Sequence, residues 1–390
     1  MKLSSDRILT THTGSLPRPA TLAELIRARE QETLSAADAE HLPQRIADAV
    51  SVVVDHQAQV GLDVISDGEM SKIGYATYVK ERLTGFDPNV AVPDGGGLSI
   101  ADLDDFPGMA ERSLAGLETA TPTCTGPISY TGTDLLDTDL ANFAAAVDSV
   151  SAGSDQPAER FMNAASPGVI ALYLPNQFYD SLDEYLFALT EAMRVEYEAI
   201  TAAGLVLQID APDLAMGRHI QYAHLSEQEF LARLRVHVEA INHALRNIDP
   251  ARVRVHLCWG NYQGPHHRDV GLDVILDAIL QLKADGLVFE AANHRHAHEW
   301  QVLADAKIPE QKVLVPGVID TSSVYIEHPE LIAQRITRFA DIVGRERVIP
   351  GTDCGFASFA TFLAVDPNLA WAKLESLTAG ARLASDRLWS

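Results

Sequence analysis

The chain has 390 residues, of which 47% are hydrophobic and 22% are charged, and its formal net charge is −24 at pH 7. This composition is typical of a globular protein and excludes disordered and collagen-like chains. A surface this acidic repels the phosphates of nucleic acids and anionic lipids, so we expect no nucleic-acid partner and no membrane partner.

The amino terminus and the cysteine content favour a cytoplasmic location. The opening residues MKLSSDRILTTHTGS lack the apolar core of a secretory signal. No stretch approaches the roughly 18 consecutive apolar residues of a membrane-spanning helix. The three cysteines, Cys124, Cys258 and Cys354, are too few for a disulfide framework. We therefore expect a cytoplasmic enzyme.

Short apolar runs recur along the chain, and amphipathic stretches separate them. The predicted strands are residues 8–13, 62–66, 161–165, 205–210, 253–258, 286–291, 313–319 and 347–352. Residues 183–203 carry apolar side chains at spacings of three and four, which indicates a helix. Residues 226–247 and 330–343 show the same helical pattern.

Strands that alternate with helices pair in parallel, because each crossover returns the chain to the same sheet. Eight such units predict an α/β protein with the (β/α)8 fold, a TIM barrel, formed by residues 1–390 as a single catalytic domain. A doubly wound open sheet is the alternative. Residues 87–156 interrupt the alternation with the motif VPDGGG and several aspartates, which predicts an insertion between the second and third strands.

Polar residues follow most of the predicted strands at the carboxyl end, where barrels of this kind form their active sites. They are Thr13, Gly14 and Ser15 after the first strand, Asp67 and Glu69 after the second, Asp210 after the fourth, His256 and Cys258 after the fifth, Glu290 after the sixth, Asp320 after the seventh, and Asp353 and Cys354 after the eighth. Polar residues are common where a strand ends, but their joint placement predicts one shared site.

The sequence His256-Leu-Cys258 is the sharpest feature of this group. Residues two apart in a strand point the same way, so both side chains can face the barrel axis. Glu290 and Cys354, at neighbouring strand ends, complete a set of one imidazole, two thiols and one carboxylate. Such a set favours zinc. The alternative is that the cysteines are small buried hydrophobic residues.

Six motifs in order give the chain a family resemblance. They are LTTHTGSLPRP, DVISDGE, LQIDAPDLAMG, VHLCWG, LVFEAA and IPGTDCG, which lie between residues 8 and 358. Together they resemble the catalytic half of cobalamin-independent methionine synthase and the related single-domain zinc thiol alkyltransferases. The resemblance implies an enzyme that activates a small thiol as a zinc thiolate and transfers an alkyl group to its sulfur.

The resemblance also implies roles for individual residues. It implies that zinc is bound by His256, Cys258, Glu290 and Cys354. It also implies that the amino-acid end of a homocysteine-like thiol is bound by Thr13, Gly14 and Ser15, with Glu69 and Asp210 as partners for its ammonium group. The reaction most similar to that of the family is methyl transfer to homocysteine, giving methionine, with a methyl-folate or another methyl carrier as donor.

The donor side departs from the family pattern. The chain is one barrel long, and Ser322 stands where the family has a histidine suited to protonating a folate leaving group. Asp320 is a candidate for that acid role, and His266, which follows the fifth strand, is a second candidate. Arg18 and Lys72 are candidates for binding a carboxylate or sulfonate of the substrate.

Other functions remain open at this stage. An enzyme similar to epoxyalkane:coenzyme M transferase would use the same metal site on an epoxide and a sulfonate thiol. A barrel decarboxylase of the uroporphyrinogen type would need no metal, and a zinc-storing module would perform no reaction. The histidines of NYQGPHHRD and NHRHAHEW form another group, which we interpret as residues of the rim loops rather than as a metal site.

Overall fold

The computed structural model describes residues 1–90, 100–109, 121–150, 157–360 and 362–390. Within these residues, seven parallel strands form one sheet in the order β1-β4-β5-β6-β7-β8-β9, and β2 pairs with β3 in a small antiparallel sheet. The strands are β1 (Val64–Ile65), β2 (Phe86–Asp87), β3 (Thr123–Cys124), β4 (Glu159–Ala165), β5 (Val206–Asp210), β6 (Val253–His256), β7 (Gly286–Phe289), β8 (Val313–Ile319) and β9 (Gly351–Thr352).

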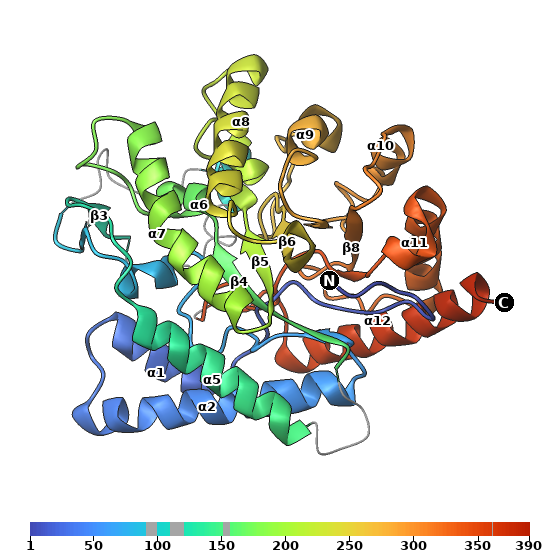
Figure 1. Cartoon of the computed structure of the whole chain (residues 1–390), viewed down its shortest axis with the longest axis horizontal. Helices are drawn as coiled ribbons and strands as arrows, with labels where there is room; N and C mark the ends of the chain where they lie inside the picture. The colour runs from blue at the N-terminus through green and yellow to red at the C-terminus, as the bar shows by residue number, and fades with distance from the viewer. Residues whose placement is uncertain (91–99, 110–120, 151–156, 361) are drawn as a thin grey trace.

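Helices surround the central strands as an outer ring (Figure 1). The α-helices are α1 (Ala20–Glu30), α2 (Ala36–Gln59), α3 (Ala101–Asp104), α5 (Thr133–Val150), α6 (Pro167–Tyr173), α7 (Leu182–Ala202), α8 (Glu227–Ala244), α9 (Leu272–Ile279), α10 (Trp300–Asp305), α11 (Pro329–Val343) and α12 (Pro367–Leu388). The 3-10 helices are η1 (Thr77–Glu81), η3 (Pro212–Leu214), η4 (Met216–Arg218), η5 (Pro250–Arg252) and η6 (Arg345–Arg347). This arrangement is the predicted TIM-barrel fold.

The first predicted strand, residues 8–13, does not form a regular strand. Residues 8–13 carry no strand assignment, yet they lie between the two edges of the sheet. The carbonyl oxygen of Thr10 accepts hydrogen bonds from the N–H groups of Asp63 and Val64, and Thr11 N–H donates to Pro350. The segment therefore connects the β1 edge of the sheet to its β9 edge through isolated backbone hydrogen bonds. It lacks the continuous ladder of hydrogen bonds that defines a strand.

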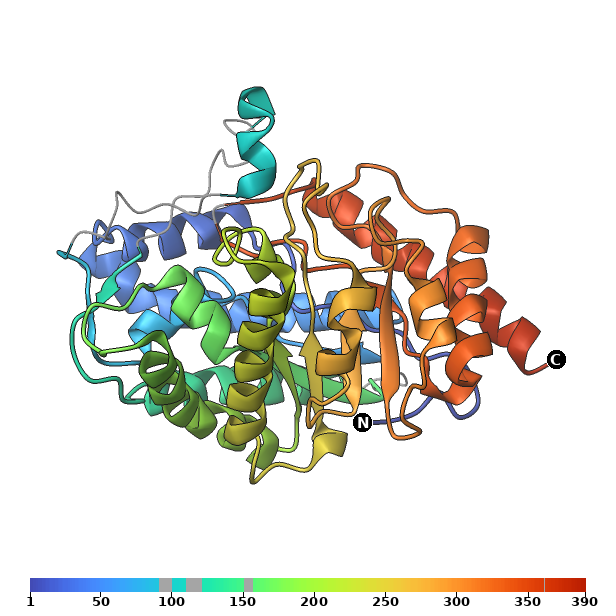
Figure 2. The ribbon, with the colours of Figure 1, turned by 90° about the horizontal axis from the view of Figure 1, so that it is seen from above.

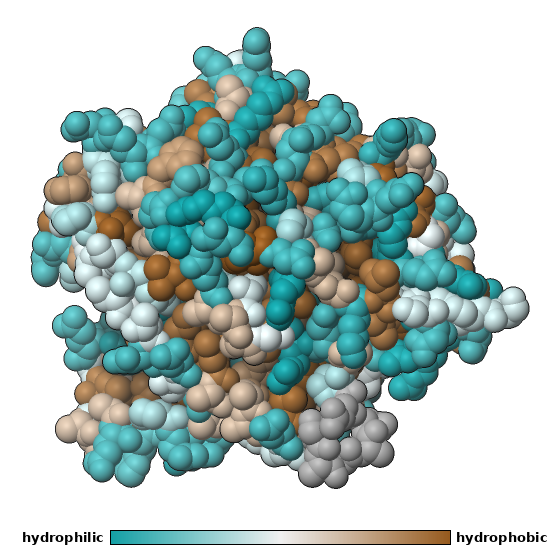
Figure 3. All heavy atoms as spheres, viewed as in Figure 1, coloured by the Kyte–Doolittle hydropathy of each residue, from teal (hydrophilic) through white to brown (hydrophobic). Residues whose placement is uncertain are grey.

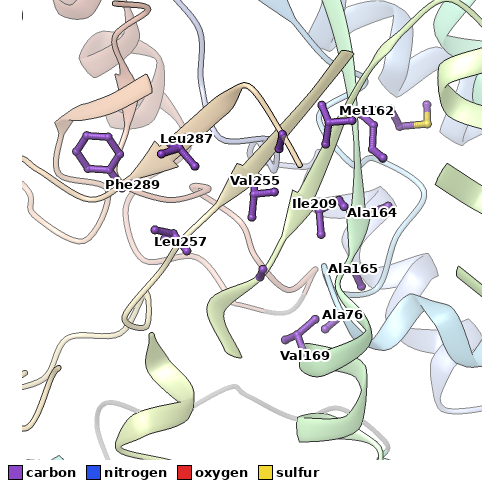
Figure 4. Packing of buried hydrophobic residues seen from close by; sticks show 14 of the residues in the cluster. Ala76, Met162, Ala164, Ala165, Val169, Ile209, Val255, Leu257, Leu287 and Phe289 are labelled. Atoms are coloured by element: carbon purple, nitrogen blue, oxygen red, sulfur yellow. The ribbon is translucent and has the colours of Figure 1, made fainter. Parts of the chain in front are cut away.

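The alternation of side chains along the strands separates two environments. Ala164, Ile209, Val255 and Leu287 are in register across four strands and belong to the large hydrophobic core (Figure 4). A second, smaller core includes Phe161, Val206, Val288 and Val315. Since residues of opposite parity on a strand face opposite sides, the large core lies against the helices and the small one fills the barrel.

A polar layer lies above the small core inside the barrel. Asn163, Gln208 and Arg254 are register partners on β4, β5 and β6, and Asp210 is paired with His256 one step further along. All five side chains are buried. Because alternate residues of a strand face the same side, each of these strands places polar side chains inside the barrel, and the last of them lie at its carboxyl rim.

The predicted helices agree closely with the observed ones. The prediction at residues 183–203 corresponds to α7, and that at 330–343 to α11. Helix α8 begins after Ser226, whose hydroxyl accepts from Glu229 N–H while the Glu229 carboxylate accepts from Ser226 N–H. This capping box fixes the start of the helix that the sequence predicted from residue 226.

The region between β1 and β4 contains the small β2–β3 sheet, α3 and α5, and the motif VPDGGG lies outside the described residues. Helix α5 packs against α2. The segment around α3, teal in Figure 2, stands on the opposite side of the molecule from the amino terminus. The assignment of residues 87–156 as an insertion within one domain stays a prediction.

The visible surface is mixed in hydropathy. Hydrophilic side chains spread over the face shown in Figure 3, with smaller hydrophobic areas between them. Among the described helices, none is both long and apolar enough to cross a membrane.

Candidate active site

A cavity of about 90 Å³ opens at the carboxyl ends of the barrel strands. One water-sized group needs roughly 10–15 Å³ on this scale, so the cavity suits a molecule the size of an amino acid. Its polar lining residues include Thr13, Ser15, Glu69, Asp210, His256, Cys258 and Cys354. Its aromatic and apolar lining residues include Tyr75, Tyr173, Met216, Phe359 and Phe362.

Three predicted metal ligands converge in this cavity. His256 ends β6, Cys258 follows it by two residues, and Cys354 lies two residues beyond β9. Ligand atoms of the three residues all lie within 4.8 Å of one another. The two Sγ atoms are 3.7 Å apart. All three side chains are buried.

The spacing of the sulfurs fits a shared metal ion. A disulfide would hold the sulfurs about 2.05 Å apart, and both cysteines are free. Two Zn–S bonds of about 2.3 Å at a tetrahedral angle place the sulfurs roughly 3.8 Å apart, close to the observed separation. The donor set of one imidazole and two thiols is also the set that zinc prefers.

Charges around these ligands favour a cation. Burial lowers the pKa of His256, but the hydrogen bond to Asp210 and the neighbouring Cys354 outweigh it and raise the pKa to about 9. The adjacent Cys354 thiol, together with burial, raises the pKa of Cys258 well above its usual value. The surroundings therefore stabilise a positive charge at this point. Cys258 and Cys354 cannot both be thiolates at low cost unless a cation lies beside them.

Glu290 lies beside the three convergent ligands. Its Oε1 accepts from the backbone N–H of Trp259 at 2.7 Å, and its Oε2 accepts from the Asn293 amide at 2.6 Å. Asp353 accepts three backbone N–H bonds from residues 291–293 and so fixes the turn after Glu290. In this arrangement both oxygens of Glu290 have protein donors, and its role as a metal ligand stays a prediction.

Asp210 holds His256 in place. Its Oδ1 faces His256 Nδ1 at 3.2 Å and accepts from the Gln208 amide at 2.7 Å, while its Oδ2 accepts from the Asn163 amide at 2.8 Å. Both oxygens are thus engaged. A carboxylate on one nitrogen of a metal-binding imidazole orients the ring and fixes its tautomer. The geometry supports this positioning role more directly than the predicted contact with an ammonium group.

Glu69 is the carboxylate left available to a ligand. It follows β1, adopts a positive φ of 58° and is buried. Its Oε2 has no hydrogen-bond partner among the described residues. Burial raises the pKa of Glu69 to about 7, with Lys72 opposing and Asp210 adding to the rise. A buried carboxylate with a free oxygen at a cavity wall is suited to receive an N–H donor.

The segment from Thr13 to Ser15 forms another part of the wall. The Thr13 carbonyl accepts from the amides of Asn163 and Gln208 at 2.9 and 2.5 Å. Gly14 has a φ of 142°, and a Cβ there would collide with the Asn163 side chain. Thr13 and Ser15 line the cavity, while Gly14 allows the backbone to approach β4 closely.

The two proposed acids lie outside this cavity. Asp320 and His266 line a second hollow of about 200 Å³, which also includes Glu290 and Cys354. The Asp320 carboxylate accepts from the N–H and hydroxyl of Ser322. The two nitrogens of His266 face Asp269 and the Tyr262 carbonyl. Their acid roles stay predictions.

Arg18 and Lys72 are buried against backbone carbonyls. Arg18 donates to the carbonyls of Ala357 and Glu69, and the Lys72 ammonium donates to the carbonyl of Asn163. Neither side chain lines the cavity, and no Lys or Arg is found among its described lining residues. The expectation that these two residues bind an anionic substrate group receives no support from the geometry.

The sequence interpretation missed several residues of the site. Asn163 and Gln208 hold Asp210 and Thr13, and the period of two on β5 was a usable signal for Gln208. Tyr75 donates to the Tyr173 hydroxyl at 3.1 Å, and both rings pack edge-on against Phe359. Tyr75 and Phe359 lie in loops, where no periodicity marks a residue that faces the cavity.

A family model described as the catalytic domain of cobalamin-independent synthase matches residues 8–91 and 176–367. The chain belongs to this family. The match confirms the resemblance carried by the six motifs, and it confirms the class of enzyme, a methyltransferase.

Individual relatives cover nearly the whole chain. The methionine synthase of Sulfurisphaera tokodaii is 25% identical over 380 residues, which is 97% of this chain and 93% of that protein. The uncharacterized protein YxjH of Bacillus subtilis is 24% identical over 381 residues, with 93% of this chain and 91% of that protein covered.

A solved structure confirms the fold. The B12-independent methionine synthase from Shewanella sp. W3-18-1, solved in complex with selenomethionine, aligns with a TM-score of 0.72 at 19% identity. The alignment covers 98% of this chain and 99% of that one. The TIM-barrel fold predicted from alternating strands and helices is therefore confirmed.

Proposed function

We propose that this enzyme is a zinc-dependent methyltransferase that transfers a methyl group to the thiol of homocysteine and forms methionine. The observation that carries the proposal is the convergence of His256, Cys258 and Cys354 on one point of a cavity the size of an amino acid. Glu290, at the end of β7, is the fourth proposed ligand. When bound, zinc would lower the pKa of the substrate thiol, so that its sulfur is nucleophilic near neutral pH.

The residues of the chain bind and orient the acceptor. The Glu69 carboxylate receives the ammonium group of homocysteine, and the segment Thr13–Ser15 receives its carboxylate end. Asp210 keeps the imidazole of His256 in the orientation that metal binding requires. Tyr75 and Tyr173 form an apolar wall near the thiols and exclude water from the reacting sulfur.

The donor is a methyl-folate or another methyl carrier, which packs against the aromatic and apolar lining residues of the cavity. Asp320 supplies a proton to the leaving group when the donor requires one. Epoxide addition to a sulfonate thiol is less suited to this site, because the unpaired carboxylate of Glu69 repels a sulfonate.

A cytoplasmic location is part of this proposal. All three cysteines are free and buried, and Cys124 lies on β3. Thiols that bind a metal must stay reduced, and the cytoplasm keeps them so.

The proposal is tested by measuring zinc per chain on the purified enzyme after incubation with zinc and by comparing acceptors. Homocysteine and 2-mercaptoethanesulfonate are each added while the zinc edge is recorded by X-ray absorption, and products are then followed with methyl-folate or an epoxide as donor. An additional sulfur ligand with homocysteine and formation of methionine are expected. A protein that holds no zinc would overturn the proposal in favour of a metal-free barrel enzyme, and zinc that no thiol perturbs would favour a storage module.

Replacing Asp210 with asparagine should weaken zinc binding about tenfold. Loss of a partner that orients a metal-binding histidine costs about 10–100-fold, and asparagine retains an acceptor oxygen, which favours the lower end. Competition with a chelator measures the affinity. Asp213→Asn is the matched control. Asp213 forms a similar buried pair with His237, which is not one of the proposed zinc ligands. Equal losses in both variants would contradict the positioning role.

A further inference from the structure

A second group of metal-binding side chains lies at the same rim, outside the cavity described above. Ligand atoms of Asp102, His266 and Asp269 all lie within 4.8 Å of one another. Asp102 belongs to α3, and the other two lie in the loop between β6 and α9. His219, which follows η4, joins them, since its Nδ1 is 3.2 Å from Asp269 Oδ1.

Several polar atoms in this group are buried without a hydrogen-bond partner among the described residues. His219 is 1% exposed, and neither of its ring nitrogens has a hydrogen-bond partner among the described residues. Asp269 Oδ1 lies 3.2 Å from His219 Nδ1, and it too has no hydrogen-bond partner among the described residues. Buried polar groups of this kind are costly unless something satisfies them. A cation between the imidazole and the carboxylate would satisfy both.

The other ligands are already oriented by neighbouring groups. Asp102 accepts from the Tyr262 hydroxyl and from Arg268 N–H, both at 3.0 Å. His266 Nε2 lies 3.1 Å from the Tyr262 carbonyl. His296 Nε2 lies 2.9 Å from Asp269 Oδ2. Outer partners that fix each ligand in this way are characteristic of metal sites.

The tautomer of His266 adds to the argument. A carbonyl accepts only, so Nε2 must carry the proton that it donates to Tyr262. In the neutral ring Nδ1 is then a lone pair, and it faces the Asp269 carboxylate at 3.0 Å. Two acceptors at this distance repel each other unless a proton or a metal ion lies between them.

We propose that Asp102, His219, His266 and Asp269 form a second metal site, for a divalent transition metal such as zinc. Two imidazoles and two carboxylates suit zinc and its neighbours in the series better than magnesium or calcium, which prefer oxygen ligands alone. The set contains no sulfur, and this distinguishes it from the cysteine-containing site.

The site links three segments of the rim. Asp102 ties residues 100–109 to the loop after β6, and His219 ties in the segment after β5. Ile100 and Tyr262, which flank these ligands, both line the catalytic cavity and pack together in one small cluster. The ion therefore holds this wall of the cavity in place, and the site does not depend on the identity of the substrate.

The test uses Co²⁺ with full-length protein in which Cys258 and Cys354 are both replaced by serine. This variant should bind about one Co²⁺ per chain, counted by elemental analysis after dialysis, with weak visible bands and no thiolate charge-transfer band. The wild type should bind one more ion and show the thiolate band. A folded double-serine variant that binds no Co²⁺ overturns the proposal.

Further substitutions in the double-serine variant locate the ion. Asp102→Asn and His219→Gln should each abolish stoichiometric Co²⁺ binding, and proteolysis near residues 100–109 should become faster. His243→Gln is the matched control, because His243 pairs with Glu191 at an exposed site elsewhere, and this variant should keep its Co²⁺. If folded Asp102→Asn and His219→Gln proteins retain the ion, the proposed ligands are wrong. The Co²⁺ count in the double-serine variant decides even if these variants fail to fold.

Discussion

Replacing Cys354 with serine is expected to remove the bound zinc and to lower methyl transfer to homocysteine at least about 100-fold. Zinc binds the thiolate of cysteine, whereas a serine hydroxyl stays protonated near neutral pH and offers a much weaker ligand. Loss of an outer partner alone costs about 10–100-fold in metal affinity or activity, so loss of a direct ligand should cost more. Zinc per chain and the initial rate of methionine formation measure the two effects.

Cys124→Ser is the control for the Cys354 substitution. Cys124 is also buried, but it lies on β3 and its Sγ faces the Gly126 carbonyl at 3.4 Å. Serine can donate the same hydrogen bond, so zinc content and activity should stay near those of the wild type. Full activity in Cys354→Ser, or equal losses in the two variants, would show that Cys354 is not a ligand.

The fold could be predicted because parallel strands of a barrel are continuous apolar runs. The run at residues 313–319 matches β8 residue for residue. The run at 8–13 looks the same in sequence, but its backbone bonds to both neighbours are isolated ones. Strand assignment needs a ladder of partners, and the residues of one segment do not reveal whether its neighbours supply them.

The site could be predicted where side-chain parity decides the outcome. A strand at residues 253–258 would place His256 and Cys258 on one face. Strand β6 ends at His256, and the structure still places both side chains beside Cys354. The face on which a residue lies does not show which other protein groups form hydrogen bonds with its side chain. The predicted roles of Glu290, Asp210 and His266 depend on those hydrogen bonds. The family resemblance implies that Asp210 is a partner for the substrate ammonium group, yet amides from two strands and an imidazole from a third surround it.

The histidine-rich loops show the same limit. Their polar composition favours solvated positions on the rim, and His267 is exposed as this predicts. His296, in contrast, is buried, stacks on Trp259 and lies between Asp269 and Glu299. Acidic partners make burial of an imidazole favourable. Glu299 is three residues away in the sequence, but Asp269 comes from another loop, and the local sequence does not show that contact.

Replacing Glu69 with glutamine should lower kcat/KM for homocysteine about 100-fold, mainly through KM. The carboxylate is expected to accept a charge-assisted hydrogen bond from the substrate ammonium, and such bonds contribute about 1.5–3 kcal/mol. The initial rate at varied homocysteine concentration measures the change. Glu32→Gln is the matched control, since Glu32 shares the positive φ of Glu69 but is exposed. A change confined to kcat would contradict a role in binding.

The pH dependence of binding separates this role from a structural one. The pKa of Glu69 is raised to about 7 by burial, so the carboxylate that the ammonium needs is lost as the pH falls through 7. Calorimetric affinity for methionine, which has no thiol to titrate, should therefore rise with pH between about 5 and 7 in the wild type. In Glu69→Gln it should be weak and independent of pH over that range.

Stability should move in the opposite direction. Because the pKa of Glu69 is higher in the folded protein than its ordinary value of 4.5, folding favours the protonated form. Stability therefore falls as the pH rises from 4.5 to about 7 and stays at the lower level above it. Glutamine has no proton to lose, so the ligand-free Glu69→Gln variant should be more stable than the wild type at pH 8 in urea unfolding. A carboxylate retained for folding would give the reverse result, because its replacement would destabilise the protein at every pH at which it is ionised.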